Sequence, residues 1–282
     1  MTTPADVAAA GQLACLLEVS APKPGNVSPE RHFHDTRYED FLASAVAIGP
    51  ALSDATLHPL GTTIRSAVEA TRRWTKSNTN LGIVLLLAPL ARAALRSGGT
   101  LRERLARVLA ETTVADATQV YAAIRHAGPG GLGETAAEDV SDTPTVTLRE
   151  AMALAADRDA VAREYVTDFA LTFEVGVPAV RVARQEGLAW TDAAVEAYLT
   201  LLASTADTHI ARKLGQAEAE SVSRRAGEVR AAGGTRSDAG RKALAALDAE
   251  LRDPRNRRNP GTTADLTCAA LFVVILEGGW DR

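Results

Sequence analysis

Five short polar segments of this chain hold most of the side chains that could take part in chemistry. They read EVSAPKPGN, KSNTNLG, GPGGLGE, TADTHIARKLG and RNPGTTAD, and each lies where a helical pattern begins or ends. Helix N-termini present unpaired N–H groups and the positive end of the helix dipole, so such segments are suited to binding anions. We therefore treat the five polar segments as one candidate site.

The side chains in and beside these segments favour one kind of chemistry. The cations are Lys23, Lys76, Arg212 and Lys213, and the carboxylates are Glu18, Asp35, Glu134, Asp207 and Asp265. Hard oxygen ligands suit Mg²⁺, which commonly bridges carboxylates and substrate phosphates. The chain has no cysteine–histidine spacing typical of zinc, no Walker lysine motif and no G-x-S-x-G. The residues alone thus predict a Mg²⁺-dependent enzyme acting on a phosphorylated small molecule.

Taken one at a time, the same residues have ordinary structural explanations. The glycines could be helix caps and turns, and Asn78 and Asn80 could be N-caps. Asp207 and Asp265 could each cap a helix, and Lys213 could lie on a solvated face. Only the combination of the five polar segments favours a site over a set of unrelated helix ends.

The elements that must position this site are helices. Apolar residues recur at helical spacing almost throughout, and no pair of strands or internal repeat is evident. We predict an all-α fold, a single globular domain over residues 1–282 with roughly a dozen helices. Thr100 and Glu103 have the spacing of a capping box, and Pro178 is expected to break a long helical run over 147–176.

Two segments are apolar on every face and are predicted to form central core helices. They read LGIVLLLAPLARAAL and LTCAALFVVIL. Both are shorter than the roughly 18 uninterrupted apolar residues of a membrane span, and Pro89 is expected to interrupt the first. We therefore predict no membrane association.

Composition excludes several other classes of protein. The formal net charge of −4 and the 4% aromatic content do not fit a nucleic-acid-binding surface. Cys15 and Cys268 lie in apolar helical patterns, as buried thiols of a reducing compartment would. Residues 1–20 lack the basic start of a signal peptide, so we predict a cytoplasmic protein. The sequence leaves the oligomeric state open, a homodimer included.

The order of the motifs resembles the triphosphoribosyl-dephospho-CoA synthase family. The blocks EVSAPKPGNV, FLASA, NTNLG, GGLGE, ADTHIARKLG and NPGTTADL follow in the same order as in that family, over about residues 10–278. The resemblance implies an all-α transferase that moves the triphosphoribosyl group of ATP to 3′-dephospho-CoA and releases adenine. It also implies Mg²⁺ as the cofactor and ATP and dephospho-CoA as the small-molecule partners.

With the resemblance, roles can be assigned to individual positions. We expect the catalytic residues to be Glu18, Asp35 and Glu134, with Glu18 favoured as the base, and the metal ligands to be Asp207 and Asp265. We expect the substrate-binding residues to be Lys23, Pro24, Gly25, Asn26, Asn78, Asn80, Gly82, Gly131, Gly133, Arg212, Lys213, Asn259 and Gly261. In this interpretation the two prolines around Lys23 stiffen a rim that directs the ammonium towards phosphate.

The chain also departs from the family pattern. Asn80 and Leu81 stand where the family has a histidine and a lysine, and Leu132 replaces a basic residue. Arg212, Lys213 and Leu214 stand where the family reads His-Arg-Gly. These departures are similar to those of archaeal and methylotroph members, and they leave the acceptor open.

Two alternatives to the transferase remain open at this point. One is a hydrolase that transfers the glycosyl centre of a nucleotide to water. The other is a helical protein that binds a nucleotide or coenzyme without catalysis.

Overall fold

The computed structural model describes residues 2–128 and 138–280, and its regular secondary structure there is helical. One isolated antiparallel bridge joins Ser28 and Arg31. The all-α prediction is confirmed. The chain divides into two compact units: unit 1 is Met1–Cys15 with Glu39–Phe169, and unit 2 is Leu16–Tyr38 with Ala170–Arg282. The boundary between them falls inside the first helix, and the assignment to a single domain stays a prediction.

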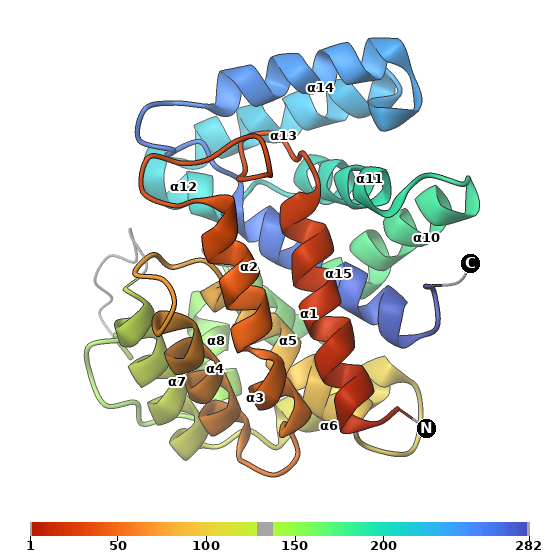
Figure 1. The fold of residues 1–282 in the computed structure, drawn as a ribbon. Coiled ribbons are helices and arrows are strands. Elements are labelled where there is room, and N and C mark those ends of the chain that lie inside the picture. The colour runs from red at the N-terminus through yellow and green to blue at the C-terminus, as the bar shows by residue number, and fades with distance from the viewer. Residues whose placement is uncertain (1, 129–137, 281–282) are drawn as a thin grey trace. The chain divides into compact units, whose positions relative to one another are not determined.

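Unit 1 begins with the first part of α1 and continues through eight further helices in its described residues (Figure 1). These are α1 (Pro4–Ser20), α2 (Tyr38–Ala47), α3 (Gly49–Ser53), α4 (Leu60–Arg72), α5 (Leu81–Ala94), α6 (Leu101–Ala110), α7 (Val114–Ala127), α8 (Leu148–Ala155) and α9 (Ala160–Thr167). Helix α4 packs against α7, and α5 packs against α4 and α6. The apolar helix α5 is buried as predicted, because residues such as Leu86, Leu87 and Leu90 are fully covered.

Helix α5 does not stop at Pro89, contrary to the expectation that this proline interrupts it. The helix runs from Leu81 to Ala94 with Pro89 inside it. Proline has no N–H, so the carbonyl of Leu85 loses its partner one turn later in the chain. The buried hydroxyl of Tyr165 in α9 donates to that carbonyl at 2.6 Å. A tertiary hydrogen bond thus replaces the helical one, and the helix tolerates its proline.

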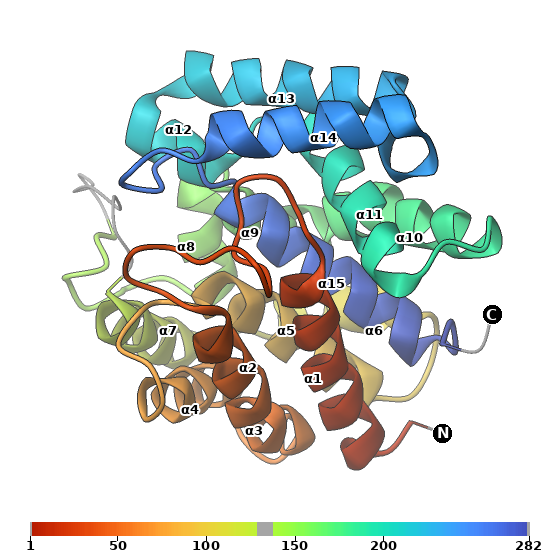
Figure 2. The same cartoon turned by 45° about the horizontal axis from the view of Figure 1, so that its top comes forward.

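Unit 2 contains the end of α1 and the C-terminal helices. They are the π-helix η1 (Leu171–Gly176), α10 (Val177–Gln185), α11 (Trp190–Ser204), α12 (Thr208–Leu214), α13 (Gln216–Ala231), the 3₁₀ turn η2 (Gly234–Arg236), α14 (Asp238–Leu251) and α15 (Gly261–Leu276). Helices α13 and α14 form a hairpin, visible in both ribbon views (Figure 2), and α13 also packs on α11. Helix α15 is buried as predicted, with Cys268 and Phe272 fully covered.

The long helical run expected over 147–176 is three elements in the structure. The first break lies between α8 and α9. The side chain of Asp159 accepts hydrogen bonds from the N–H groups of Val161 and Ala162, so Asp159 is the N-cap at which α9 begins. Asp168 and Phe169 then adopt left-handed backbone angles, with φ of 50° and 61°, and end α9. Pro178 is not a break, because it lies in the first turn of α10, where a missing N–H costs nothing.

The local signal for the start of α6 agrees with the structure. The capping box of Thr100 and Glu103 is confirmed, since each side chain accepts from the backbone N–H of the other. In the described part of the chain, no helix combines the length and the apolar character that crossing a membrane requires.

The hydrogen bond from Tyr165 to the Leu85 carbonyl makes a prediction about stability. Tyr165→Phe should lower the free energy of unfolding by about 1–3 kcal/mol, because it leaves the Leu85 carbonyl buried without a donor. In a Pro89→Ala background the same change should cost less, since alanine at position 89 restores the helical N–H. Urea denaturation followed by circular dichroism measures the four corners of this double-mutant cycle. Equal costs in both backgrounds would contradict the compensation.

Candidate active site

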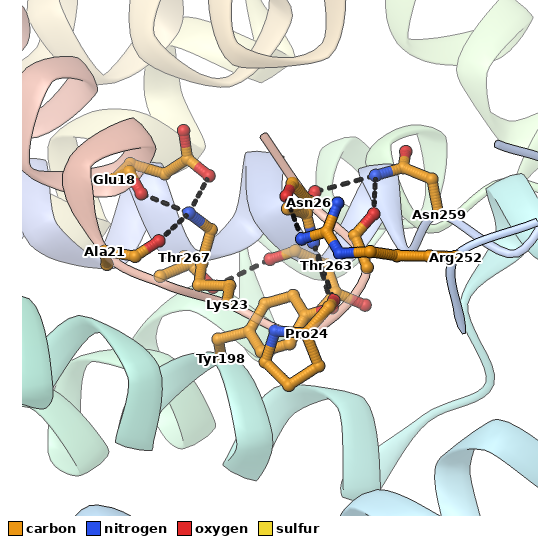
Figure 3. Close-up of polar contacts among 11 residues, drawn as sticks. Glu18, Ala21, Lys23, Pro24, Asn26, Tyr198, Arg252, Asn259, Thr263 and Thr267 are labelled. Carbon is orange, nitrogen blue, oxygen red and sulfur yellow. Dashed lines mark hydrogen bonds and ion pairs between the residues drawn. The ribbon is translucent and has the colours of Figure 1, made fainter. Parts of the chain in front are cut away.

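Three of the five polar segments meet in unit 2. They are the loop that follows α1 (residues 21–27), the start of α12 and the segment that leads into α15. Figure 3 shows the first and the last of these. Asn259 bonds to the first loop, and Asp207 at the start of α12 bonds to Thr263 of α15. These hydrogen bonds join the three segments, and the prediction that all five form one site stays a prediction. The KSNTNLG segment belongs to unit 1.

Lys23 lies at the end of α1 and is buried, with 1% of its surface exposed. Its Nζ lies 3.0 Å from Oε1 of Glu18 and donates to the carbonyls of Glu18 and Ala21, the latter at 3.2 Å. These three acceptors match the three N–H bonds of an ammonium group. The carbonyls at the C-terminal end of a helix lack helical partners, so Lys23 caps α1. The expectation that Lys23 is directed towards phosphate is not met in this structure.

Glu18 shares the burial of its partner, with 5% of its side chain exposed. A buried ammonium requires a counter-charge, and Glu18 provides it. This arrangement gives Glu18 a structural role, which does not match a base that must reach a substrate hydroxyl.

The loop after Lys23 is fixed by a chain of buried hydrogen bonds (Figure 3). The hydroxyl of Tyr198 in α11 donates to the carbonyl of Pro24 at 2.7 Å and accepts from Nδ2 of Asn26 at 3.0 Å. Nδ2 of Asn259 donates to the carbonyl of Gly25 at 3.0 Å and to Oδ1 of Asn26 at 2.9 Å. Asn26 and Asn259 therefore hold the loop itself, and their amide NH₂ groups are already occupied.

Helix α14 holds the same loop from its C-terminal turn. The N–H of Gly25 donates to Oδ1 of Asp248 at 2.8 Å, and Nη2 of Arg252 donates to the carbonyl of Asn26 at 2.9 Å. Arg252 and Asp248 also pair with each other at 2.7 Å. Gly25 has φ of +75°, and a Cβ there would lie 2.9 Å from Cβ of Leu251. Glycine is thus required for both backbone conformation and close packing.

Asp207 is the N-cap of α12 and is 1% exposed. Its Oδ1 accepts from the N–H groups of His209 and Ile210, and its Oδ2 accepts from the N–H and hydroxyl of Thr263. Burial raises the pKa of this carboxyl, and the four hydrogen bonds oppose that shift. One side chain thus starts α12 and ties it to α15.

The expected metal ligands do not fit a Mg²⁺ ion in this arrangement. A carboxylate has about four lone-pair positions, and all four of Asp207 accept hydrogen bonds. Asp265 lies half-buried in α15. Within residues 2–128 and 138–280, no group of three or more histidine, cysteine, aspartate or glutamate side chains could hold a metal ion. The structure therefore favours a capping role for Asp207 over metal binding.

The cations of the site lie at the C-terminal end of α12. Lys213 is exposed and Arg212 is half-buried. Partial desolvation of its ammonium group and the charge of Arg212 lower the pKa of Lys213. His209 lies one turn earlier, and burial with the charges of Lys213 and Arg212 lowers its pKa to about 3. The imidazole is therefore neutral at physiological pH, and its ring lies 3.5 Å from the position a Cβ on Gly261 would take.

Among the carboxylates of the candidate site that the structure describes, Asp35 is the exposed one, with 61% of its side chain accessible. Nε2 of His34 lies 3.8 Å from its Oδ2. Nδ1 of His34 lies 3.0 Å from Nδ2 of Asn256, in the segment between α14 and α15. Asp35 thus lies on a loop that contacts the same segment as Gly25 and Asn26.

The KSNTNLG segment caps α5 in unit 1. Oδ1 of Asn78 accepts from the N–H of Leu81 at 3.1 Å, so the exposed Asn78 caps the first turn. Nδ2 of the buried Asn80 donates to the hydroxyl of Thr71 at 3.0 Å. Gly82 lies in the first turn of α5. Gly131, Gly133 and Glu134 lie outside the described residues, so their predicted roles stay predictions.

Sequence reasoning missed four residues of this site. Tyr198, Asp248 and Arg252 hold the 21–27 loop, and His209 packs beside Gly261. His209 could have been found, because it belongs to a polar segment. Tyr198, Asp248 and Arg252 carry no local signal, since they lie in or at the end of ordinary helical patterns.

The buried pair makes a prediction that separates its structural role from phosphate binding. Lys23→Met should lower the free energy of unfolding by roughly 3–5 kcal/mol, because Glu18 is left as an unpaired buried charge. The double variant Glu18→Gln with Lys23→Met should recover a large part of that loss. Chemical denaturation measures both. A Lys23→Met protein with wild-type stability and weakened nucleotide binding would restore Lys23 as a phosphate ligand.

His209 makes a prediction about pH. Its pKa is lowered to about 3 in the folded protein from an ordinary value of 6.5, so the unfolded chain takes up a proton first as pH falls. The contribution of His209 to stability is therefore present above about pH 6.5 and is lost progressively towards pH 3. His209→Gln should make stability fall less steeply with acid across that window. Parallel curves of unfolding free energy against pH for the two proteins would contradict this.

Comparison with known proteins assigns the chain to a family. The model of the ATP:dephospho-CoA triphosphoribosyl transferase family matches residues 4–282. The 2-(5″-triphosphoribosyl)-3′-dephosphocoenzyme-A synthase of Klebsiella pneumoniae is 35% identical over 104 residues, which cover 37% of this chain and 36% of that protein. The aligned segment thus spans about a third of that relative's length.

A solved structure is similar over more of the chain. It is a crystal structure of a candidate triphosphoribosyl-dephospho-CoA synthase from Archaeoglobus fulgidus, 28% identical, with a TM-score of 0.66. The match covers 84% of this chain and 99% of that one. Because the family model spans nearly the whole sequence, the chain belongs to the ATP:dephospho-CoA triphosphoribosyl transferase family.

Proposed function

We propose that the protein transfers the triphosphoribosyl group of ATP to the 2′-hydroxyl of 3′-dephospho-CoA and releases adenine. The bond between ribose C1 and adenine breaks, and a bond from C1 to the acceptor oxygen forms. The observation that carries this proposal is the family match over residues 4–282. The meeting of three motif-bearing segments in unit 2 supports it.

In this proposal, exposed residues carry the chemistry and buried ones hold them in place. Asp35 is an accessible carboxylate, and in this proposal it accepts the proton of the acceptor hydroxyl as general base. Lys213 and Arg212 at the end of α12 face the phosphates. Lys23, Asn26 and Asn259 fix the 21–27 loop and do not contact substrate. Glu134 stays a catalytic candidate.

Mg²⁺ remains part of the proposal as an ion brought by the nucleotide. A triphosphate carries about four negative charges at neutral pH, and Mg²⁺ usually keeps several waters while bound to phosphate oxygens. This ion would neutralise charge on the triphosphate and needs no cage of protein carboxylates. Omitting Mg²⁺ or adding EDTA should abolish turnover.

One incubation tests the proposed reaction against its alternatives. The protein is mixed with ATP and Mg²⁺, with and without dephospho-CoA, and the products are separated by chromatography and weighed by mass spectrometry. Adenine release that requires dephospho-CoA and yields the condensed product supports the transferase. Adenine release without an acceptor identifies a nucleotide N-glycosyl hydrolase. Nucleotide binding with no release of adenine identifies a non-catalytic binding protein.

The base assignment makes its own prediction. Asp35→Asn should lower kcat by roughly 10²–10⁴-fold while leaving the unfolding midpoint near that of the wild type, because the side chain is exposed. Glu18→Gln should instead lower the unfolding midpoint, since it removes the counter-charge of Lys23. Turnover and thermal melting are measured on both proteins. A fully active Asp35→Asn enzyme would exclude Asp35 as the base.

A further inference from the structure

The end of α4 carries an exposed tryptophan among cations. Trp74 is 70% exposed, and Arg73 and Lys76 beside it are also exposed. No aspartate or glutamate occurs between residues 70 and 102. Among the described residues, neither Arg73 nor Lys76 forms an ion pair. This short stretch therefore combines an accessible aromatic ring with positive charge that the described part of the chain does not neutralise.

The backbone around this tryptophan is well fixed. The N–H of Trp74 and that of Thr75 both donate to the carbonyl of Thr71, at 2.9 and 3.2 Å. The guanidinium of Arg72 donates to the carbonyl of Lys76. Nδ2 of Asn80 donates to the hydroxyl of Thr71. The segment is thus held in one conformation while the indole stays in solvent.

The other tryptophans of the chain have partners. Trp190 and Trp280 stack with ring centroids 5.1 Å apart, and the guanidinium of Arg184 lies 4.6 Å from the Trp190 centroid. A single exposed apolar residue is ordinary on a protein surface. The combination of an open indole, neighbouring cations and a fixed backbone is what proteins use to bind nucleotides, with the base on the ring and the phosphates near the cations.

We propose that Trp74 is a stacking surface for an adenine base on unit 1, with Arg73 and Lys76 facing the phosphates of the same ligand. This inference goes beyond the proposed function and rests on it only for the identity of the candidate ligands. ATP and dephospho-CoA both contain adenine and phosphate groups, so either could supply the base. Asn78, four residues after Trp74, belongs to the KSNTNLG segment, whose motif resembles that of the family.

Direct binding measurements on the full chain test this without any turnover. ATP, dephospho-CoA and inorganic tripolyphosphate are titrated by calorimetry into wild type, Trp74→Ala, Trp74→Phe and the double variant Arg73→Ala with Lys76→Ala. Trp280→Phe is the matched control, because it alters a tryptophan that has a stacking partner. Base stacking on an aromatic side chain predicts a loss of roughly 5- to 150-fold in affinity on Trp74→Ala.

The expected pattern distinguishes base from phosphate. Trp74→Ala should weaken binding of ATP or of dephospho-CoA, and the affected ligand identifies the source of the base. Trp74→Phe should keep most of the affinity, and Trp280→Phe should change none of it. Tripolyphosphate should be insensitive to Trp74→Ala but weakened by the double cation variant. Quenching of indole fluorescence by the affected ligand should disappear in Trp74→Ala.

Several outcomes would overturn the inference. The first is that Trp74→Ala binds both adenine-containing ligands as tightly as the wild type does. The second is that Trp74→Ala weakens tripolyphosphate binding as much as it weakens binding of the adenine-containing ligands. The third is that the wild type binds none of the three ligands. A dimer in sedimentation that dissociates on Trp74→Ala, with nucleotide affinity unchanged, would assign the ring to a contact between copies of the chain. Binding through Trp74 without release of adenine would refute the proposed reaction and leave the stacking surface standing.

Discussion

A buried ammonium group at the end of α1 is the constraint on which the candidate site depends. Burying Lys23 is costly unless every N–H bond finds an acceptor and a negative charge lies close by. Glu18 supplies that charge, and two carbonyls at the end of the helix supply the other acceptors. The same contacts end α1, so the direction in which the chain leaves the helix is fixed where the 21–27 loop begins.

The loop in turn is bonded to other elements of unit 2. Tyr198 bonds to Pro24 and Asn26, and Asn259 bonds to Gly25 and Asn26. These groups are buried and mutually satisfied, so removing one leaves another without a partner. The motif residues that first suggested phosphate binding are therefore largely a framework. Groups that meet a substrate must come from the accessible surface around it, which is why Asp35 and Lys213 take the chemical roles in our proposal.

The same rule explains two contacts away from the 21–27 loop. Proline inside α5 leaves the Leu85 carbonyl without its helical donor, and Tyr165 supplies another. The start of α12 leaves N–H groups without helical acceptors, and Asp207 accepts from two of them while also binding Thr263. In the first case the side chain comes from another helix of the same unit, and in the second it is the N-cap residue of α12 itself. Asp207 cannot serve that purpose and also coordinate a metal ion, because its lone pairs are used.

The sequence by itself determined the fold class, the two apolar core helices, the capping box at Thr100 and the positions of the polar segments. These properties follow from local periodicity and from short-range hydrogen bonding, which neighbouring residues are enough to define. Motif order also indicated the family. Only the tertiary structure decided what Lys23, Glu18 and Asp207 do, because a charged side chain in a sequence carries no sign of whether it will be buried. Thr263, which bonds to Asp207, is distant in the chain and is brought near only by packing. Glu18 is close to Lys23 in the sequence, but the burial that makes each charge need the other comes from packing.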